Sequence, residues 1–221
     1  MATRQVLAQI SLAYANQGEC RVEIESVGGL DAAKRIAAGD PFDVVLLGSD
    51  AIDKLIAAGH VLAGSRTDWV TSPISIAMKN GAYPADTASA SGLKNALLAA
   101  QSISYSTGPS GVYLAQLFEK MGIAEALKAK TIVPPPGVPV GSLVARGEVE
   151  IGFQQRSELI SVEGIQVLGN LPDELAYITT FSAGLPTHAS EALREAAQQF
   201  LNFLNSAQAA PIKQSQGMNP I

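Results

Sequence analysis

Small polar residues and glycines gather in a loop between a predicted strand at Ile103–Tyr105 and a predicted helix at 111–121. The loop contains hydroxyl groups at Ser106, Thr107 and Ser110, followed by Gly111. The first-turn N–H groups of a helix have no intrahelical partner, and the helix dipole is positive there. Hydroxyl donors beside such a terminus favour a bound anion. A helix capped by Ser110, with nothing bound, is the alternative.

Two further loops repeat this composition at the ends of predicted strands. Gly28 and Gly29 follow a predicted strand at 21–27, and Gly48 with Ser49 follows one at 42–47. In open α/β sheets, ligands bind outside the carboxyl ends of the strands. The three loops together predict a site for a small anion.

Amide and guanidinium groups add donors suited to a carboxylate. Gln154 and Gln155 come at the end of a predicted strand at 150–154, and Arg156 follows them. A planar guanidinium binds a carboxylate through two parallel hydrogen bonds. Arg4 lies near the start of the first predicted helix, where its charge opposes the dipole, and carboxylate binding would give it a role. Solvent-exposed surface positions are the alternative for these side chains.

The composition excludes several classes of function. The chain has 221 residues, of which 47% are hydrophobic and 16% charged, as expected for one large domain or two small lobes with a real core. A net charge of -5 and the lack of a basic run argue against nucleic acid. No apolar stretch approaches the roughly 18–20 residues of a membrane span, and we expect no membrane insertion and no signal peptide within this sequence.

Cofactor and metal motifs are also missing from the sequence. The single cysteine, Cys20, excludes an internal disulfide and a site built from several thiolates. There is no Walker loop, no Gly-x-Ser-x-Gly elbow, and no Gly-x-Gly-x-x-Gly after a strand. We therefore expect no cofactor and no metal.

Predicted strands and helices alternate along most of the chain, which indicates an α/β protein with a parallel sheet flanked by helices. The predicted strands are at 21–27, 42–47, 73–78, 103–105, 131–133, 150–154, 165–168 and 176–181. The predicted helices are at 2–17, 31–38, 49–58, 91–100, 111–121, 138–146, 189–205 and 207–216. The chain thus begins with a helix, whereas an α/β unit of this type usually begins with a strand.

The order of these elements resembles the molybdate-binding proteins of ABC transporters and the wider group of type 2 periplasmic binding proteins. The phrases that carry the resemblance lie at 35–45, 106–113, 141–152 and 164–174. The resemblance implies two α/β lobes, each a mixed, mostly parallel sheet flanked by helices, that close on a ligand by hinge motion. It implies one lobe from 1–70 and 180–221, a second from 75–175, and hinges near 71–74 and 176–180. Family members begin with a strand that would precede Met1, so we expect the first strand to be missing from this sequence.

The resemblance also implies which residues bind the ligand. Carried over position by position, they are Thr3, Arg4, Gly28, Gly29, Ser106, Thr107, Ser110, Gly111, Val140, Gln154 and Gln155. For proteins that bind molybdate, the resemblance implies a neutral binding site of hydroxyl and backbone N–H groups, with a tyrosine at the position of Gln155. Arg4 and Arg156 add positive charge, which favours an organic di- or tricarboxylate over a molybdate-type oxyanion.

Two functions fit this resemblance. The first is a substrate-binding protein for a small anion, with an ABC transporter permease as a possible partner. The alternative is an isomerase, because some proteins that resemble this family are aconitate isomerases, which move a double bond by proton transfer. That reaction requires a general base, and Tyr105, Tyr113 and Lys34 are the candidates. The sequence leaves the location open: cytoplasmic as written, or periplasmic if an upstream segment was lost.

Overall fold

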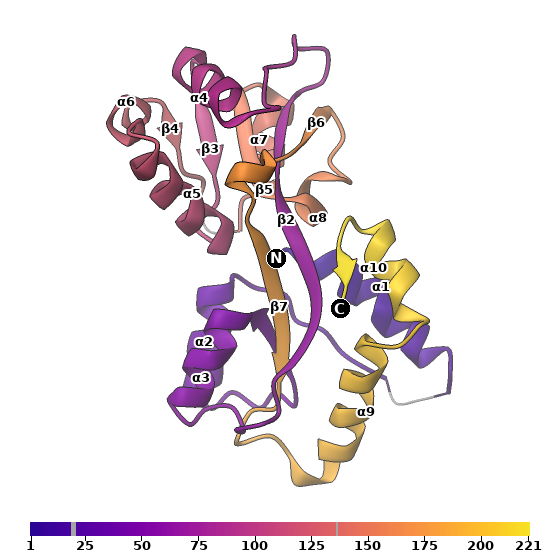
Figure 1. Ribbon diagram of the computed structural model, residues 1–221. Helices are drawn as coiled ribbons and strands as arrows, with labels where there is room; N and C mark the ends of the chain where they lie inside the picture. Colours follow the sequence, from indigo (N-terminus) through magenta and orange to yellow (C-terminus); the bar gives the residue numbers. More distant parts are fainter. Residues whose placement is uncertain (19–20, 136) are drawn as a thin grey trace. The chain divides into compact units, whose positions relative to one another are not determined.

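The computed structural model describes residues 1–18, 21–135 and 137–221 (Figure 1). Cys20 lies outside the described residues. Internal contacts divide the chain into unit 1, which comprises Met1–Ser72 and Thr180–Ile221, and unit 2, which comprises Pro73–Thr179. The chain passes from one unit to the other within two strands, β2 (Thr67–Lys79) and β7 (Ile178–Gly184).

Unit 1 has helices on both faces of its strands. Strand β1 (Val45–Gly48) pairs antiparallel with β7, and the two-residue strand β8 (Asn219–Pro220) pairs with the first half of β2. The helices of unit 1 are α1 (Arg4–Ala15), α2 (Gly29–Ala38), α3 (Ser49–Ala57), α9 (Arg194–Leu204) and α10 (Ala209–Ser215), with a 3-10 turn η2 (Glu191–Leu193) before α9. Helices α2 and α3 cover one face, and α1, α9 and α10 cover the other (Figure 1).

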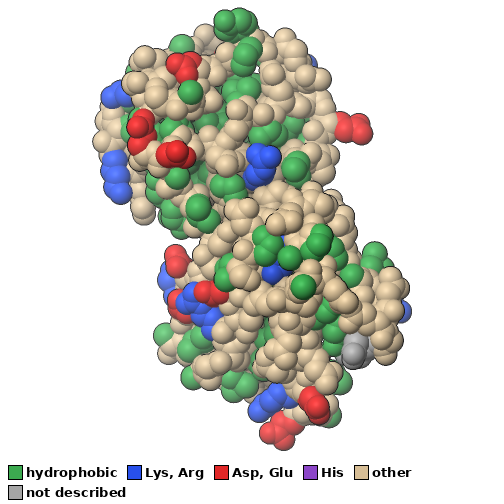
Figure 2. Space-filling view, turned by 45° about the vertical axis from the view of Figure 1, so that its right-hand side comes forward, with side chains coloured by type: hydrophobic (Ala, Val, Ile, Leu, Met, Phe, Trp, Pro, Cys, Tyr) green, Lys and Arg blue, Asp and Glu red, His purple; other side chains and the backbone are tan. Residues whose placement is uncertain are grey.

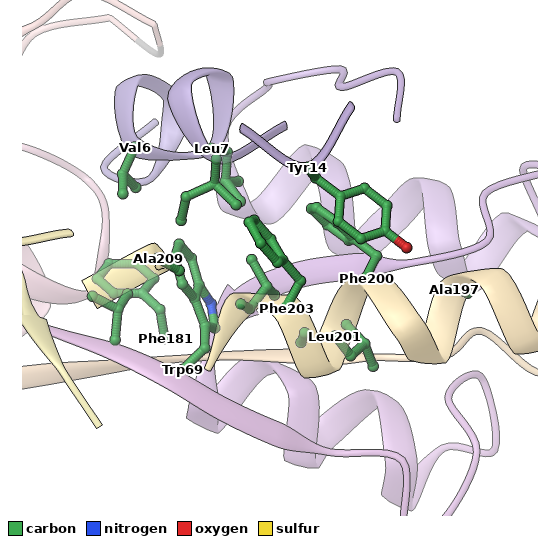
Figure 3. Close-up of a cluster of buried hydrophobic side chains, with 14 of the residues drawn as sticks. Val6, Leu7, Tyr14, Trp69, Phe181, Ala197, Phe200, Leu201, Phe203 and Ala209 are labelled. Carbon is green, nitrogen blue, oxygen red and sulfur yellow. The ribbon is translucent and has the colours of Figure 1, made fainter. Parts of the chain in front are cut away.

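The larger core of unit 1 is built from the apolar faces of its helices (Figure 3). Tyr14 of α1 lies against Phe200 and Phe203 of α9, with ring centroids 5.4 and 5.1 Å apart. Trp69 of β2 is fully buried in the same cluster. Each large apolar side chain buried in this way contributes about 1.5–3 kcal/mol to folding. The helices predicted at 2–17 and 189–205 are confirmed as α1 and α9, although α9 begins only at Arg194.

The strand predicted at 21–27 is not formed. Residues 21–28 have no regular secondary structure, and within the described pairings β1 pairs only with β7. An extended segment becomes a strand only when a neighbour takes up its backbone hydrogen bonds. Val22 packs at the edge of the core, while Ile24 is 37% exposed. The alternating residues therefore do not pair with a neighbouring strand.

Unit 2 is a mixed sheet with helices around it. Strand β5 (Ile151–Gln155) pairs antiparallel with the second half of β2 and parallel with β3 (Ile103–Tyr105). Strand β4 (Thr131–Ile132) pairs parallel with β3, and β6 (Ile165–Asn170) pairs antiparallel with β2. The helices are α4 (Ala90–Ala99), α5 (Pro109–Lys120), α6 (Ala124–Lys128), α7 (Val140–Arg146) and α8 (Arg156–Leu159), with a 3-10 turn η1 (Asp173–Leu175). The predicted α/β class is confirmed.

The surface carries scattered charges of both signs. Figure 2 shows Lys, Arg, Asp and Glu side chains dispersed over one face, without a continuous basic patch there. In the described part of the chain, no helix is long and apolar enough to cross a membrane.

Candidate anion-binding site

The carboxyl ends of β3 and β5 meet at one edge of the unit 2 sheet. These strands are parallel neighbours, and Tyr105 is paired with Phe153. The loop before α5 and the end of β5 therefore leave the sheet at the same edge. The start of α7 lies there as well, because the Gly141 N–H donates to Gln154 Oε1 at 3.1 Å. The structure thus brings together the predicted residues of unit 2: Ser106, Thr107, Ser110, Gly111, Val140, Gln154 and Gln155.

Helix α5 begins without a side-chain cap. Its N-cap residue is Gly108, so no side chain caps the first turn. Ser110 lies inside that turn. The alternative of a helix capped by Ser110 is therefore wrong. The hydroxyl oxygens of Ser106 and Ser110 lie 3.4 Å apart beside this terminus. A 12-residue helix with an uncapped start and two hydroxyl groups offers donors to an anion.

Gly111 is required by packing within unit 2. A Cβ atom at this position would lie 1.5 Å from the carbonyl oxygen of Ser106. The loop therefore folds back onto the first turn of α5 only because residue 111 has no side chain. This requirement holds whether or not a ligand is bound.

The two glutamines at the end of β5 differ in how far their amides are satisfied. Gln154 is held through its amide oxygen, since its Oε1 accepts from the Gly141 N–H at 3.1 Å. Gln155 is 3% exposed, and its Nε2 donates to Thr179 Oγ1 at 2.7 Å. Its Oε1 has no hydrogen-bond partner among the described residues. A threonine hydroxyl both donates and accepts, so the amide fits in either orientation and one end stays open in both.

Glu158 is the residue at this edge that the sequence interpretation missed. It is the third residue of α8, whose N-cap residue is Gln155. Burial raises the pKa of Glu158 above its ordinary value. The sequence from Gln155 to Glu158 lacks the Ser or Thr that begins a capping box, so no sequence signal marked this glutamate.

The arginines fall into two groups. Arg21, Arg35, Arg66 and Arg146 each form an ion pair with a nearby carboxylate. Arg4, Arg156 and Arg194, by contrast, have no carboxylate within 4.0 Å in the described part of the chain. The charges of Arg4 and Arg156, the two candidates from the sequence, are therefore available to an external anion.

In unit 1, two helices begin beside the end of β1 without side-chain caps. The N-cap of α2 is Gly28 and that of α3 is Gly48. A Cβ atom at Gly29 would lie 3.8 Å from Leu47 of β1, which places the start of α2 next to that strand end. One at Gly28 would lie 3.4 Å from Asp31 Oδ2, so packing tolerates a side chain at both glycines. This edge of unit 1 offers uncapped backbone N–H donors.

Thr3 and Arg4 lie at the amino end of α1. Thr3 is buried and is the N-cap residue, without a side-chain cap hydrogen bond, while Arg4 is exposed. Over the described residues, no hydrogen bond or ion pair joins either of them to the start of α2. Their assignment to the ligand site stays a prediction.

The tyrosines considered as bases have structural contacts. The Tyr113 hydroxyl donates to the Leu175 carbonyl at 3.1 Å, and its ring stacks on Tyr177 with centroids 4.3 Å apart. Tyr105 packs edge-on against Phe118, with ring centroids 5.9 Å apart.

Within the described residues, no group of three or more His, Cys, Asp or Glu side chains could hold a metal ion.

A family model described as bacterial extracellular solute-binding protein matches residues 1–219. The chain belongs to this family. It is 39% identical over 188 residues to an aconitate isomerase from Pseudomonas sp, and this alignment covers 85% of this chain and 71% of that protein. It is 27% identical over 187 residues to the molybdate-binding protein ModA of Azotobacter vinelandii, covering 83% and 73%.

Two solved structures share the fold. The periplasmic molybdate-binding protein of Azotobacter vinelandii matches with a TM-score of 0.80 and 21% identity over 98% of this chain and 95% of that one. Peb3 from Campylobacter jejuni matches with a TM-score of 0.69 and 13% identity over 99% and 96%. The resemblance to periplasmic binding proteins that the sequence predicted is confirmed.

Proposed function

We propose that this solute-binding protein binds a small organic di- or tricarboxylate, with aconitate as the first compound to test. The observation that carries the proposal is the open end of the buried Gln155 amide, next to Arg156, whose guanidinium has no ion pair within the described residues. A buried polar group without a partner costs about 1–3 kcal/mol. When the amide is turned so that Oε1 accepts from the Thr179 hydroxyl, Nε2 lies at the open end and can donate a hydrogen bond to a ligand carboxylate, which removes that cost.

Several separate donors at one edge suit a ligand with more than one carboxylate. The uncapped start of α5, the hydroxyls of Ser106 and Ser110, and the end of β5 all lie at the carboxyl edge of the unit 2 sheet. Hydrogen bonds from ionised or dipolar donors to a carboxylate are stronger than those between neutral groups. The 27% identity to a molybdate-binding protein keeps molybdate in the set of ligands to test.

Isomerisation of aconitate is the second candidate function. The 39% identity to an aconitate isomerase over 85% of this chain favours it. The reaction moves a carbon–carbon double bond by taking a proton from one carbon and returning a proton to another. It needs one group that exchanges protons, and donors that stabilise the charge that develops on the carboxylates.

In the binding-protein function, an ABC transporter permease would receive the ligand.

Thermal unfolding with single ligands tests the proposal. The ligands are cis-aconitate, trans-aconitate, citrate, malate, molybdate and sulfate. A ligand at 100 times its Kd stabilises the folded state by about 2.7 kcal/mol, which raises the unfolding midpoint by roughly 5–10 °C in a protein of this size. We expect a shift with carboxylates. A shift with molybdate alone would assign the protein to oxyanion binding instead.

Proton NMR then separates binding from isomerisation. The protein is incubated with one aconitate isomer, and the signals of the other isomer are followed over time. Appearance of the second isomer supports the isomerase function, and its lack in the presence of proven binding leaves the protein as a binder.

A further inference from the structure

Thr179 lies beside Gln155 in the interior of unit 2. It is the second residue of β7 and is 4% exposed, and its hydroxyl oxygen lies 2.7 Å from Nε2 of the Gln155 amide. Gln155 is 3% exposed, and the other end of its amide has no partner among the described residues. The Thr179 hydroxyl therefore contacts one end of a buried amide whose other end is open.

The segment that carries Thr179 is held in place by neighbouring elements of unit 2. The Tyr113 hydroxyl of α5 donates to the Leu175 carbonyl at 3.1 Å, and the Tyr113 ring stacks on Tyr177 with centroids 4.3 Å apart. The Ile74 N–H of β2 donates to the Tyr177 carbonyl at 3.4 Å. A threonine side chain is also stiff at χ1, because it is branched at Cβ. The hydroxyl of Thr179 is thus fixed against the amide.

The two orientations of the Gln155 amide present different groups to a ligand. If Nε2 faces Thr179, the open end is Oε1, an acceptor that repels the oxygens of an ionised carboxylate. If Oε1 faces Thr179, the open end is the NH2 group, which donates to a carboxylate. In that second orientation Oε1 stays buried, and the Thr179 hydroxyl satisfies it by donating its proton. A bound carboxylate therefore needs Thr179 as a hydrogen-bond donor.

We propose that Thr179 is a positioning residue of the ligand site: it donates to Oε1 of Gln155 and so turns the NH2 group of this amide toward a ligand carboxylate. The inference rests on the proposed binding of a carboxylate. The hydroxyl, the amide and the carboxylate then form one chain of hydrogen bonds. Because hydrogen bonds in a chain polarise one another, the bond to the carboxylate is stronger than an amide without this partner would make. Thr179 acts through Gln155.

The variant Thr179→Val tests this role, because valine has nearly the shape of threonine but cannot donate. An amide that presents its NH2 group to the ligand then leaves Oε1 buried and unpaired, so we expect the affinity for trans-aconitate to fall by about fivefold to tenfold. Thr179→Ser keeps the hydroxyl and should stay within about twofold of the wild type. Thr180→Val, at the next residue of β7, is the matched control, because successive side chains of a strand point to opposite faces.

A double-mutant cycle separates positioning from a general effect on the fold. If Thr179 acts through the Gln155 amide, Thr179→Val should cause no further loss of affinity in a Gln155→Leu protein. Replacement of both partners by apolar residues leaves neither of them unpaired, so the double variant should fold. Calorimetric titration with trans-aconitate gives the Kd of each variant. In the wild type, NMR of the side-chain NH2 group, assigned by its loss in Gln155→Leu, should show a downfield shift when the ligand binds.

Equal affinity in Thr179→Val and the wild type overturns the inference and leaves the proposed function standing. The same holds if Thr179→Val weakens binding as much in the Gln155→Leu protein as in the wild type, because Thr179 would then act by another route. An NH2 signal that does not shift while the wild type binds the ligand also overturns the inference, even if a variant does not fold. A wild-type protein that binds no carboxylate overturns both the inference and the proposed function.

Discussion

The backbone N–H of Gly141 donates to the side-chain Oε1 of Gln154 at 3.1 Å. This bond attaches the first turn of α7 to the end of β5. Gln154 therefore holds two elements of unit 2 together. Its neighbour Gln155 keeps one end of its amide open, so two adjacent residues of the same type have different consequences when they are replaced.

Replacement of the two glutamines by leucine should separate ligand binding from stability. Gln155→Leu removes the open amide, and we expect it to weaken carboxylate binding by at least about tenfold. Gln154→Leu leaves the Gly141 N–H buried without a partner, which costs about 1–3 kcal/mol and lowers the unfolding midpoint by several degrees. Thermal unfolding and ligand titration of both variants check this. Equal ligand affinity in Gln155→Leu and the wild type would contradict the proposed site.

Arg4 can be tested in the same way. It is exposed and has no ion pair within the described residues, so Arg4→Ala should leave the unfolding midpoint within about 1 °C. We expect carboxylate affinity to fall by about tenfold or more, because a guanidinium contact is lost. Arg21→Ala removes a surface arginine paired only with the exposed Glu23 and serves as the control. Unchanged affinity in Arg4→Ala would remove this residue from the site.

The glycines of the two units should respond differently to alanine. A Cβ at Gly111 would overlap the Ser106 carbonyl, so Gly111→Ala should destabilise unit 2 or displace its loop. Gly29→Ala places a methyl group at an ordinary 3.8 Å from Leu47, and we expect unchanged or slightly higher stability, by up to about 1 kcal/mol. Urea unfolding of both variants measures the difference. A Gly111→Ala protein as stable as the wild type would contradict the folded-back loop.

The buried Lys213 should make the stability of the protein depend on alkaline pH. Its Nζ donates to the Trp69 carbonyl at 2.5 Å and to Asn205 Oδ1 at 3.2 Å, and burial lowers its pKa from 10.5 to about 8. Between these two values the unfolded chain binds more protons than the folded one. The free energy of unfolding contributed by Lys213 therefore rises as the pH increases from about 8 to about 10.5.

Urea unfolding at several pH values in this window measures that contribution. In Lys213→Met, which keeps an unbranched side chain without the charge, we expect this part of the rise to vanish. Lys120→Met, at an exposed residue of α5, is the control and should follow the wild type. Identical pH profiles for Lys213→Met and the wild type would show that Lys213 is not desolvated in the folded state.

The α/β class and most helices followed from residue patterns alone. Periodicity and turn residues are local features, and they predicted the helices that the structure shows as α1 and α9. The structure then brings the Ser106 loop and the end of β5 to one sheet edge, because β3 and β5 are parallel neighbours.

Features that depend on distant partners could not be read in this way. Residues 21–28 alternate like a strand but have no regular structure, because a strand forms only beside another strand. Gln154 and Gln155 look alike in the sequence, yet the amide oxygen of Gln154 accepts from Gly141 and that of Gln155 has no partner among the described residues. Burial and hydrogen-bond partners come from segments far away along the chain, so the contrast between these residues emerges only when those segments are folded together.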